Sequence, residues 1–299
     1  MSRARLRAAL FGAVMLVAGT TGAAPGAASA ADQSTVAPAA RFALALNAPP
    51  CSNRTTGYGV GSDGNLWLYV FGGQEGNCAT SWTSRTVIDS GWSGVQQVFA
   101  DHNTIFAIGS NGDMKWYGYD PVNHSWQPGS GLVIGGGWDG FTHVAYAGDG
   151  VFYAVDGDGT LFWYRRLDVT QEFSAWYNDG VGAAIGSGFQ IADQFFAARG
   201  AVYLSDSAGN LFWYGYSDSL SPDGVWVPTS GARIGAGWNT FTSVSAEWGV
   251  AISGSPYVYI AGADANGDLL VYQHYGPDTG VANWGVIGAG TLVGGGTLN

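Results

Sequence analysis

One stretch of the sequence, from Trp138 to Gly186, occurs in five copies along the chain. Within it, four short runs of β-branched and aromatic residues are each closed by glycine or by Asp-Gly. Such runs are typical of antiparallel strands joined by tight turns. A single four-stranded sheet cannot bury both of its faces alone, so each copy is expected to stack against the next one.

The spacing of the copies predicts the architecture. A turn glycine precedes the third strand of every copy, and the successive spacings are 48, 47, 50 and 58 residues, at Gly64, Gly112, Gly159, Gly209 and Gly267. A period near 50 residues with four strands in each unit is characteristic of a β-propeller. We therefore predict an all-β fold, a five-bladed β-propeller of four-stranded antiparallel blades. The strands of each blade are lettered A to D in chain order.

The repeat also predicts where the domain lies. The propeller is expected over residues 41–299, with blades at about 41–90, 91–137, 138–187, 188–237 and 238–296. The pattern after the last blade calls for a new A strand, which Phe42 supplies at the other end of the domain. The ring is therefore expected to close between whole blades.

The first 30 residues have the features of a signal peptide. Three arginines precede an apolar run from Ala8 to Gly19, and Ala28-Ser29-Ala30 is a small-residue cleavage pattern. The apolar run is too short to span a bilayer, although a signal anchor stays open as an alternative. We expect export of a secreted, extracellular protein, with residues 31–40 as a disordered leader.

Two cysteines in an exported chain favour a disulfide between Cys51 and Cys78, both in the first blade. Their spacing suits neither a redox pair nor a zinc site. The bridge would contribute roughly 3 kcal/mol by restricting the unfolded chain. Alkylation under denaturing conditions should find no free thiol, and reduction should lower the melting temperature by several degrees. Two cysteines alkylated without prior reduction would contradict the pairing.

The charge balance argues against several classes of partner. Removing the three arginines of the signal peptide leaves eight basic residues against 22 acidic ones, a net charge of −14. Such a surface repels phosphate backbones and anionic lipids, so we expect neither nucleic-acid binding nor membrane insertion. We also expect no cofactor and no metal, because the four histidines show no metal-ligand spacing.

The junctions between blades carry the main candidate for binding. A glycine and an aromatic residue recur there, as Gly91-Trp92, Gly137-Trp138, Gly188-Phe189 and Gly237-Trp238. A flat indole face beside exposed backbone amides suits a sugar ring, which offers C–H groups on its face and hydroxyls at its rim. The alternative is that the tryptophan fills the gap between blades while the glycines turn the chain.

Two further sets of tryptophans recur. One set lies six to ten residues before the end of each D strand, in loops expected at the surface, which favours a role in binding, at Trp82, Trp126, Trp176, Trp226 and Trp284. The other set lies in the C strands and is expected to pack between blades, at Trp67, Trp116, Trp163 and Trp213.

A longer motif recurs at the junctions: a tryptophan, six to nine residues, and then Ile/Val-Gly-x-Gly-Trp-x-x-Phe. Through this motif the chain resembles the tachylectin-type five-bladed propeller lectins over residues 41–296. The resemblance implies binding of N-acetylglucosamine or N-acetylgalactosamine between adjacent blades. Carried onto this chain, with the neighbouring polar residues and loop tryptophans added, the candidate sugar-binding residues are Trp92, Gly136, Gly137, Trp138, Asp139, Phe141, Gly237, Trp238, Asn239, Phe241, Trp126, Trp176 and Trp226. Phe189 and Thr297 replace the junction tryptophan, so we expect two to four bound sugars rather than five.

Evidence for catalysis is weak at the level of sequence, so we predict a protein that is not an enzyme. Most carboxylates flank turns, and the only glutamates, Glu75, Glu172 and Glu247, are not paired along the chain. Asp193, on a predicted A strand that departs from the repeat, is the one acid considered as a catalytic candidate. Two alternatives to a lectin stay open: a propeller glycoside hydrolase or lyase, indicated by carboxylates meeting at the ring axis, and a non-sugar adhesion scaffold, indicated by buried junction tryptophans. The turn at 264–268 is read as a hairpin turn or a weak calcium loop.

Overall fold

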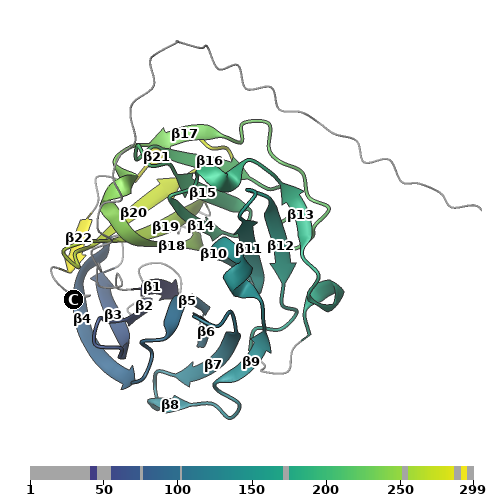
Figure 1. The fold of residues 1–299 in the computed structure, drawn as a ribbon. Helices are drawn as coiled ribbons and strands as arrows, with labels where there is room; N and C mark the ends of the chain where they lie inside the picture. Colours follow the sequence, from purple (N-terminus) through teal and green to yellow (C-terminus); the bar gives the residue numbers. More distant parts are fainter. Residues whose placement is uncertain are drawn as a thin grey trace, which may run out of the picture. The chain divides into compact units, whose positions relative to one another are not determined.

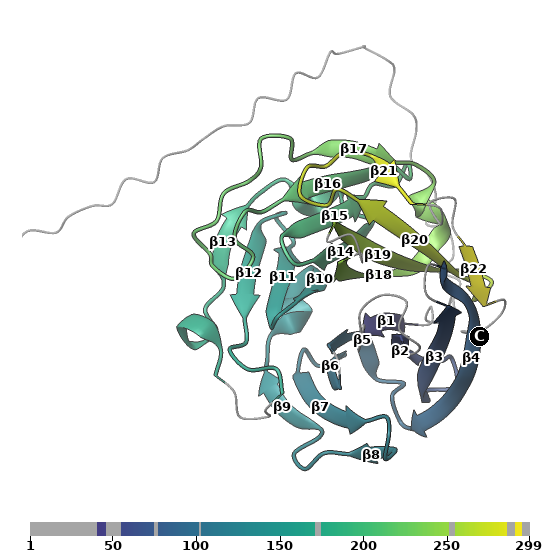
Figure 2. The same cartoon turned by 180° about the vertical axis from the view of Figure 1, so that it is seen from behind.

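Five antiparallel sheets account for the residues described in the computed structural model (Figures 1 and 2). The described residues are 41–45, 55–74, 77–101, 103–170, 175–250, 255–285 and 291–294, and all of them belong to one unit, Ala37–Asn299. The predicted signal peptide (1–30), the leader (31–40) and Cys51 lie outside them. Export, the leader and the disulfide therefore stay predictions.

The sheets follow one another along the chain, and each runs from its A strand to its D strand. Blade 1 contains β1 (Arg41–Ala45), β2 (Thr55–Val60), β3 (Leu66–Gln74) and β4 (Asn77–Asp89). Blade 2 contains β5 (Val95–Asp101), β6 (Thr104–Gly109), β7 (Met114–Asp120), β8 (Ser125–Trp126) and β9 (Leu132–Gly135). Blade 3 contains β10 (Phe141–Gly148), β11 (Val151–Asp156), β12 (Leu161–Arg165) and β13 (Ala183–Gly186).

Blades 4 and 5 repeat this order. Blade 4 contains β14 (Gln194–Ala198), β15 (Ala201–Ser205), β16 (Leu211–Gly215) and β17 (Ala232–Gly235). Blade 5 contains β18 (Phe241–Val250), β19 (Pro256–Asp264), β20 (Leu269–Tyr275), β21 (Asn283–Trp284) and β22 (Thr291–Gly294). In blades 2 and 5 the outer edge is shared, because β8 and β9 both pair with β7, and β21 and β22 both pair with β20.

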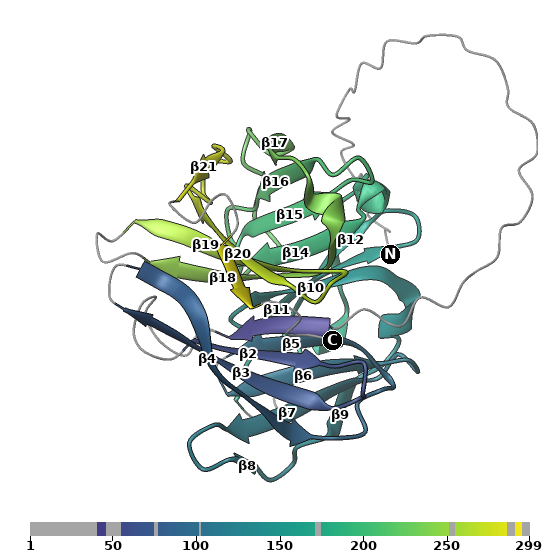
Figure 3. The same cartoon turned by 90° about the vertical axis from the view of Figure 1, so that its left-hand side faces the viewer.

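The five sheets close into a ring. The A strands are the innermost, and β1 lies beside both β5 and β18, while β10 lies beside β14 and β14 beside β18 (Figures 1 and 3). On the outside, β22 of blade 5 lies beside β4 of blade 1. The predicted five-bladed β-propeller of four-stranded antiparallel blades is therefore confirmed.

The antiparallel order of the strands gives every blade two different ends. The B–C turns and the junctions to the next blade lie at one end, called here the junction end. The A–B turns and the C–D loops lie at the other, called here the loop end. Any feature that repeats in the four described junctions therefore lies on one side of the ring.

The core lies between blades rather than within them. Within the described residues, each of four apolar clusters joins two successive blades. The cluster between blades 2 and 3, for example, buries Trp116, Trp138 and Phe152 together. Both faces of the strands are apolar because each blade is covered on both sides by its neighbours. Among the described residues no helix has the length and apolar character needed to cross a membrane.

Blades 4 and 5 share a buried histidine. His274 of β20 is fully buried, and its Nδ1 lies 2.9 Å from the hydroxyl of Tyr203 in β15. Its Nε2 lies 2.9 Å from the carbonyl oxygen of Val281, which can only accept. Nε2 therefore carries a hydrogen, and in the neutral ring Nδ1 accepts one from the Tyr203 hydroxyl. Burial lowers the pKa of His274 below its ordinary value.

This histidine predicts a loss of stability in mild acid. The unfolded chain takes up the proton near pH 6.5, whereas the folded chain resists it, so the free energy of unfolding should fall as the pH drops below 6.5. Melting temperatures measured between pH 7.5 and 5.5 should decline more steeply in the wild type than in His274→Gln. Equal slopes in the two proteins would show that His274 does not couple folding to pH.

Candidate functional site

The C-strand tryptophans tie each blade to the next. Trp116 and Trp163 are almost wholly buried, and their indole N–H groups donate to Val169 O at 2.8 Å and Ser219 O at 2.9 Å. Each acceptor lies in the C–D loop of the following blade. Trp213 is equally buried and lies against Gly280 of the blade 5 loop. Packing between blades is therefore confirmed for these three, while Trp67 is half-buried beneath the guanidinium of Arg85.

The junction aromatics are also part of the core. Trp92, Trp138 and Trp238 are 3%, 6% and 4% exposed, and Phe189 occupies the same place between blades 3 and 4 at 4%. Around Trp138, the ring centroids of Tyr164, Trp176, Phe152 and Phe141 lie 5.1–5.8 Å away. A ring enclosed in this way has no open face for a sugar. The packing alternative therefore describes these residues, and the stacking role suggested by the sequence is wrong for their rings.

The tryptophans of the C–D loops are the partly exposed members of the same clusters. Their indole N–H groups donate to the D strand of the preceding blade, from Trp176 to Ile134 O at 2.6 Å and from Trp226 to Ile185 O at 2.8 Å. Trp284 repeats the bond with Ile234 O at 3.0 Å. Each ring packs against the junction aromatic, with centroid distances of 5.7–6.5 Å over the set Trp126, Trp176, Trp226 and Trp284.

These loop tryptophans therefore combine a fixed position with partial exposure. Trp126 lies in the short strand β8, while Trp176 and Trp226 form isolated bridges to the ends of their C strands. The sequence interpretation placed Trp82 in a loop as well, but it lies within the long strand β4, opposite Phe71. Blade 1 differs because β3 and β4 continue as one hairpin where the other blades have a polar loop.

The junction backbone has the same geometry at four blade boundaries. The N–H of the junction aromatic donates to the carbonyl of the preceding B–C turn glycine, over 2.8–3.1 Å, in the pairs Trp92–Gly64, Trp138–Gly112, Phe189–Gly159 and Trp238–Gly209. The glycine just before the aromatic has a φ of 80–92°, which favours glycine, at Gly91, Gly137, Gly188 and Gly237. A one-turn 3₁₀ helix follows in three of them: η1 (Trp138–Gly140), η3 (Phe189–Ile191) and η4 (Trp238–Thr240).

The residue after the junction aromatic lies directly against that turn glycine. A Cβ atom added to Gly112 would be 2.1 Å from Asp139 Oδ1, and one added to Gly209 would be 2.5 Å from Asn239 Oδ1. With φ values of 77° and 79° these two positions favour glycine, and a side chain there would displace the residue after the junction aromatic. The corresponding residues of all four junctions are polar and exposed: Ser93, Asp139, Gln190 and Asn239. They are called the junction polar residues below.

The remaining candidate residues are the phenylalanines and glycines on either side of the junction tryptophans. Phe141 is half-buried and Phe241 is buried, and each packs beside its junction tryptophan, at 5.8 Å and 5.5 Å between ring centroids. A Cβ atom on Gly136 would be 3.7 Å from Asp113 Oδ1, in ordinary contact. No side chain within the described residues comes within 4 Å of a Cβ atom placed on Gly137 or Gly237. The backbone at Gly137 and Gly237 is thus exposed and not covered by a side chain.

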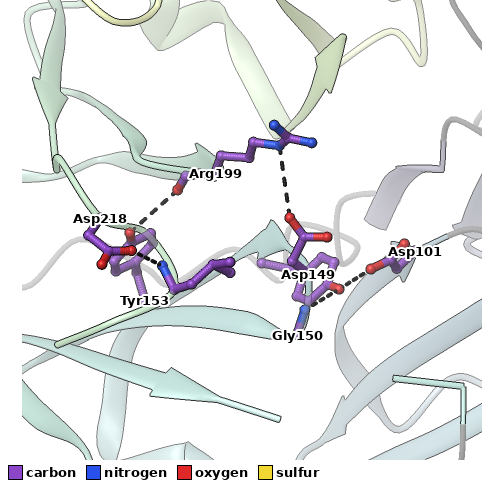
Figure 4. A network of polar contacts seen from close by, with 8 residues as sticks. Asp101, Asp149, Gly150, Tyr153, Arg199 and Asp218 are labelled. Atoms are coloured by element: carbon purple, nitrogen blue, oxygen red, sulfur yellow. Dashed lines mark hydrogen bonds and ion pairs between the residues drawn. The ribbon is translucent and has the colours of Figure 1, made fainter. Parts of the chain in front are cut away.

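A second group of polar side chains meets near the ring axis at the loop end, as Figure 4 shows in part. The Tyr146 hydroxyl of blade 3 donates to the Asp101 carboxylate of blade 2 and accepts from the Gly150 N–H at 3.0 Å. Arg199 Nε of blade 4 lies 3.9 Å from Asp149 Oδ2 of blade 3. We call Asp101, Tyr146, Asp149, Arg199, Glu247 and Trp248 the axial cluster.

Blade 5 completes the axial cluster. The Arg199 guanidinium lies 5.2 Å from the ring centroid of Trp248, a cation–π distance. Burial, with the nearby charges of Asp101 and Asp149, raises the pKa of Glu247 well above its ordinary value. Burial and the Asp101 carboxylate likewise hold the pKa of Tyr146 high, so its hydroxyl stays a donor. Sequence reasoning missed this cluster, because its members are spread over four repeats and their residue types do not repeat from blade to blade.

The other acids have simpler roles. The carboxylate of Asp264 accepts from the backbone N–H of Asn266 at 2.8 Å and of Asp268 at 2.9 Å, as in a hairpin turn. Asp193 lies at the junction end, where its N–H donates to Ser205 O at 2.7 Å, and it is not part of the axial cluster. Within the described ranges, no group of three or more His, Cys, Asp or Glu side chains could hold a metal ion.

Comparison with known proteins supports the fold. No family model and no curated protein matches the sequence. Among solved structures, AofleA from Arthrobotrys oligospora is similar with a TM-score of 0.51, at 10% identity over 83% of this chain and 85% of that chain. At this identity the likeness shows a shared fold alone.

Two lectin structures are similar at lower scores. The fungal lectin of Aleuria aurantia, described as a six-bladed β-propeller that recognises fucose, has a TM-score of 0.44 at 14% identity, covering 87% of this chain and 80% of that one. The BP39L lectin from Burkholderia pseudomallei has a TM-score of 0.41 at 17% identity, covering 84% and 69%. Neither is described as a tachylectin, and the tachylectin-type resemblance stays a prediction.

Proposed function

We propose that the protein is a secreted, multivalent carbohydrate-binding protein, with one binding surface at each of several blade junctions. The observation that carries the proposal is the repetition at the blade boundaries. Four boundaries share the same hydrogen-bonded backbone, the same partly exposed loop tryptophan and an exposed polar residue. A partly exposed indole edge, open backbone and a polar side chain at one boundary are the groups that a sugar requires.

The proposal assigns new roles to the candidate residues. Trp92, Trp138 and Trp238 support the surface from beneath, together with Phe141 and Phe241. The apolar contact with the sugar falls to Trp126, Trp176 and Trp226, and to the equivalent Trp284 of blade 5. Gly136, Gly137 and Gly237 leave the backbone open to hydrogen bonds, and Asp139 and Asn239 contribute side-chain donors or acceptors.

The charge of the protein restricts the ligand. With a net charge of −11 for the whole chain, acidic polysaccharides are repelled at low ionic strength. Neutral sugars are not, and an N-acetylated amino sugar such as N-acetylglucosamine or N-acetylgalactosamine adds an amide that can bond to backbone groups. Amino sugars of this type are therefore the proposed ligands.

Binding measured on Asp139→Ala tests the assignment of the junction surface. Asp139 is exposed and has no hydrogen-bond partner within the described residues, so its removal should leave the melting temperature unchanged. One sugar site of the protein should be lost or weakened in calorimetry. Asp278→Ala, which removes an exposed aspartate of the blade 5 C–D loop, is the matched control and should bind as the wild type does.

Two alternatives have an observation in their favour. The burial of the junction tryptophans is what a non-sugar scaffold would show, and the absence of binding to any glycan in an array would favour it. The axial cluster favours a glycoside hydrolase, because it brings the carboxyl groups of Asp101, Asp149 and Glu247 to one end of the ring. Such enzymes use two carboxyl groups across the scissile bond.

We expect no hydrolysis, because the two aspartates are engaged by neighbouring blades through Tyr146 and Arg199. The protein should release no reducing ends from chitin oligomers and no nitrophenol from common nitrophenyl glycosides. Turnover that disappears in Glu247→Gln and persists in Asp193→Asn would place catalysis in the axial cluster and replace the lectin proposal.

A further inference from the structure

We propose that the junction polar residue selects the charge of the sugar at each boundary. Asp139 then gives the junction between blades 2 and 3 a preference for an amino sugar with a free, protonated amine. Asn239 gives the junction between blades 4 and 5 a preference for the N-acetylated form. This inference rests on the proposed function, and it makes the sites of one chain chemically different.

The two residues occupy equivalent positions. Each follows a buried junction tryptophan, in η1 and η4 respectively, and each lies against the glycine of the preceding B–C turn. The hydrogen bonds from the tryptophan N–H to that turn measure 3.0 Å and 3.1 Å, and the preceding glycines have φ values of 80° and 83°. The two junctions therefore have the same backbone geometry and differ in the side chain, Asp139 in one and Asn239 in the other.

The two side chains differ in charge and in what they are bonded to. The Asp139 carboxylate is exposed and has no hydrogen-bond partner among the described residues, so both oxygens are free to accept from an ammonium group. Asn239 donates from Nδ2 to Ser207 O over 3.5 Å, which leaves its oxygen as a neutral acceptor. The amide N–H of an N-acetyl group can donate to the neutral Asn239 oxygen. No charged group has to lose its water of hydration when this bond forms, as a carboxylate would.

The surroundings increase the contrast. Asp113 follows the turn glycine of blade 2, near Gly136, whereas Asn210 occupies that place in blade 4. Blade 4 holds one carboxylate in its turn, Asp206, which accepts from Asn210 at 2.8 Å, just as Asp113 accepts from Asn111 at 2.7 Å. Asp113 and Asp139 together give the junction between blades 2 and 3 two carboxylates, against one for the junction between blades 4 and 5. One cation lies near each turn, Lys115 opposite Val133 and Arg233 opposite Phe212. The junction between blades 2 and 3 is thus the more negative of the two.

Reciprocal substitutions test the inference. Calorimetry at pH 6 and low salt would use the wild type, Asp139→Asn and Asn239→Asp, with the trimer of glucosamine and the trimer of N-acetylglucosamine as probes. In Asp139→Asn, the affinity for the glucosamine trimer should fall about tenfold, as expected for one charge-assisted hydrogen bond. Asn239→Asp should gain a second site for that trimer. Both effects should shrink in 0.5 M salt.

The outcomes separate this inference from the proposed function. If the N-acetylglucosamine trimer binds and neither substitution changes the ratio of the two affinities, the inference is wrong and the lectin proposal stands. If neither trimer binds the wild type, the proposed function fails at the same time. Both positions are exposed, so the substitutions should leave the melting temperatures unchanged. Unchanged melting temperatures would exclude misfolding as the cause of any change in affinity.

Discussion

Trp138→Ala is expected to lower the free energy of unfolding by about 3–5 kcal/mol, the usual cost of truncating a buried tryptophan. The side chain is 6% exposed and fills the space between blades 2 and 3, where it contacts four other aromatic rings. Its removal would leave a cavity that the two blades can close only by moving together. Sugar binding at this boundary should be lost as a consequence of the damaged packing.

Thermal unfolding would measure the effect, with an expected fall of about 10 °C in the melting temperature. Trp138→Phe is the matched control. It should be far milder, because Phe189 fills the equivalent place between blades 3 and 4 with the same backbone hydrogen bond. An alanine variant that melts with the wild type but binds one sugar fewer would restore the stacking role of the indole.

Binding to a surface that carries many sugars is expected to be about 10²- to 10⁴-fold tighter than binding of the free monosaccharide. A single monosaccharide offers few atoms and little area, so each junction alone should be weak. The four described junctions lie at the same end of the ring, so several of them can engage one surface at once.

Kinetics on sensor surfaces of high and low sugar density would measure this gain. The dissociation rate should rise steeply as the density falls, while free N-acetylglucosamine competes only at high concentration. A rate that does not depend on density would mean that one site acts alone, and it would contradict multivalent binding.

The fold could be predicted from the sequence because five copies of a four-strand pattern, with a period near 50 residues, correspond to five blades. The turn glycines at 112, 159 and 209 have φ values of 77–80°, which favour glycine, and each lies against the polar residue of the following junction. Within each strand the side chains alternate between the two faces of the blade, and apolar residues on both faces predict that both are covered by neighbouring blades. Blade 1 was less predictable: Trp82 follows the repeat in sequence, yet its segment continues as strand β4.

The site could be predicted only in part. The repeated tryptophans identify the junctions, but their spacing cannot say which rings are covered. Trp138 and Trp176 both recur in the repeat, and only the structure shows that the ring of Trp138 is buried while that of Trp176 is partly exposed. The axial cluster was out of reach for a different reason. Asp101, Asp149 and Glu247 belong to three repeats, and only closure of the ring brings them together.

Counting the sugars bound by one chain tests the central claim most directly. Calorimetric titration of the mature protein with N-acetylglucosamine, or with N-acetylgalactosamine, should give two to four weak sites per chain, with one site fewer in Asp139→Ala. A stoichiometry of one that is unchanged in this variant, or no binding to either sugar, would contradict a lectin with its sites at the blade junctions.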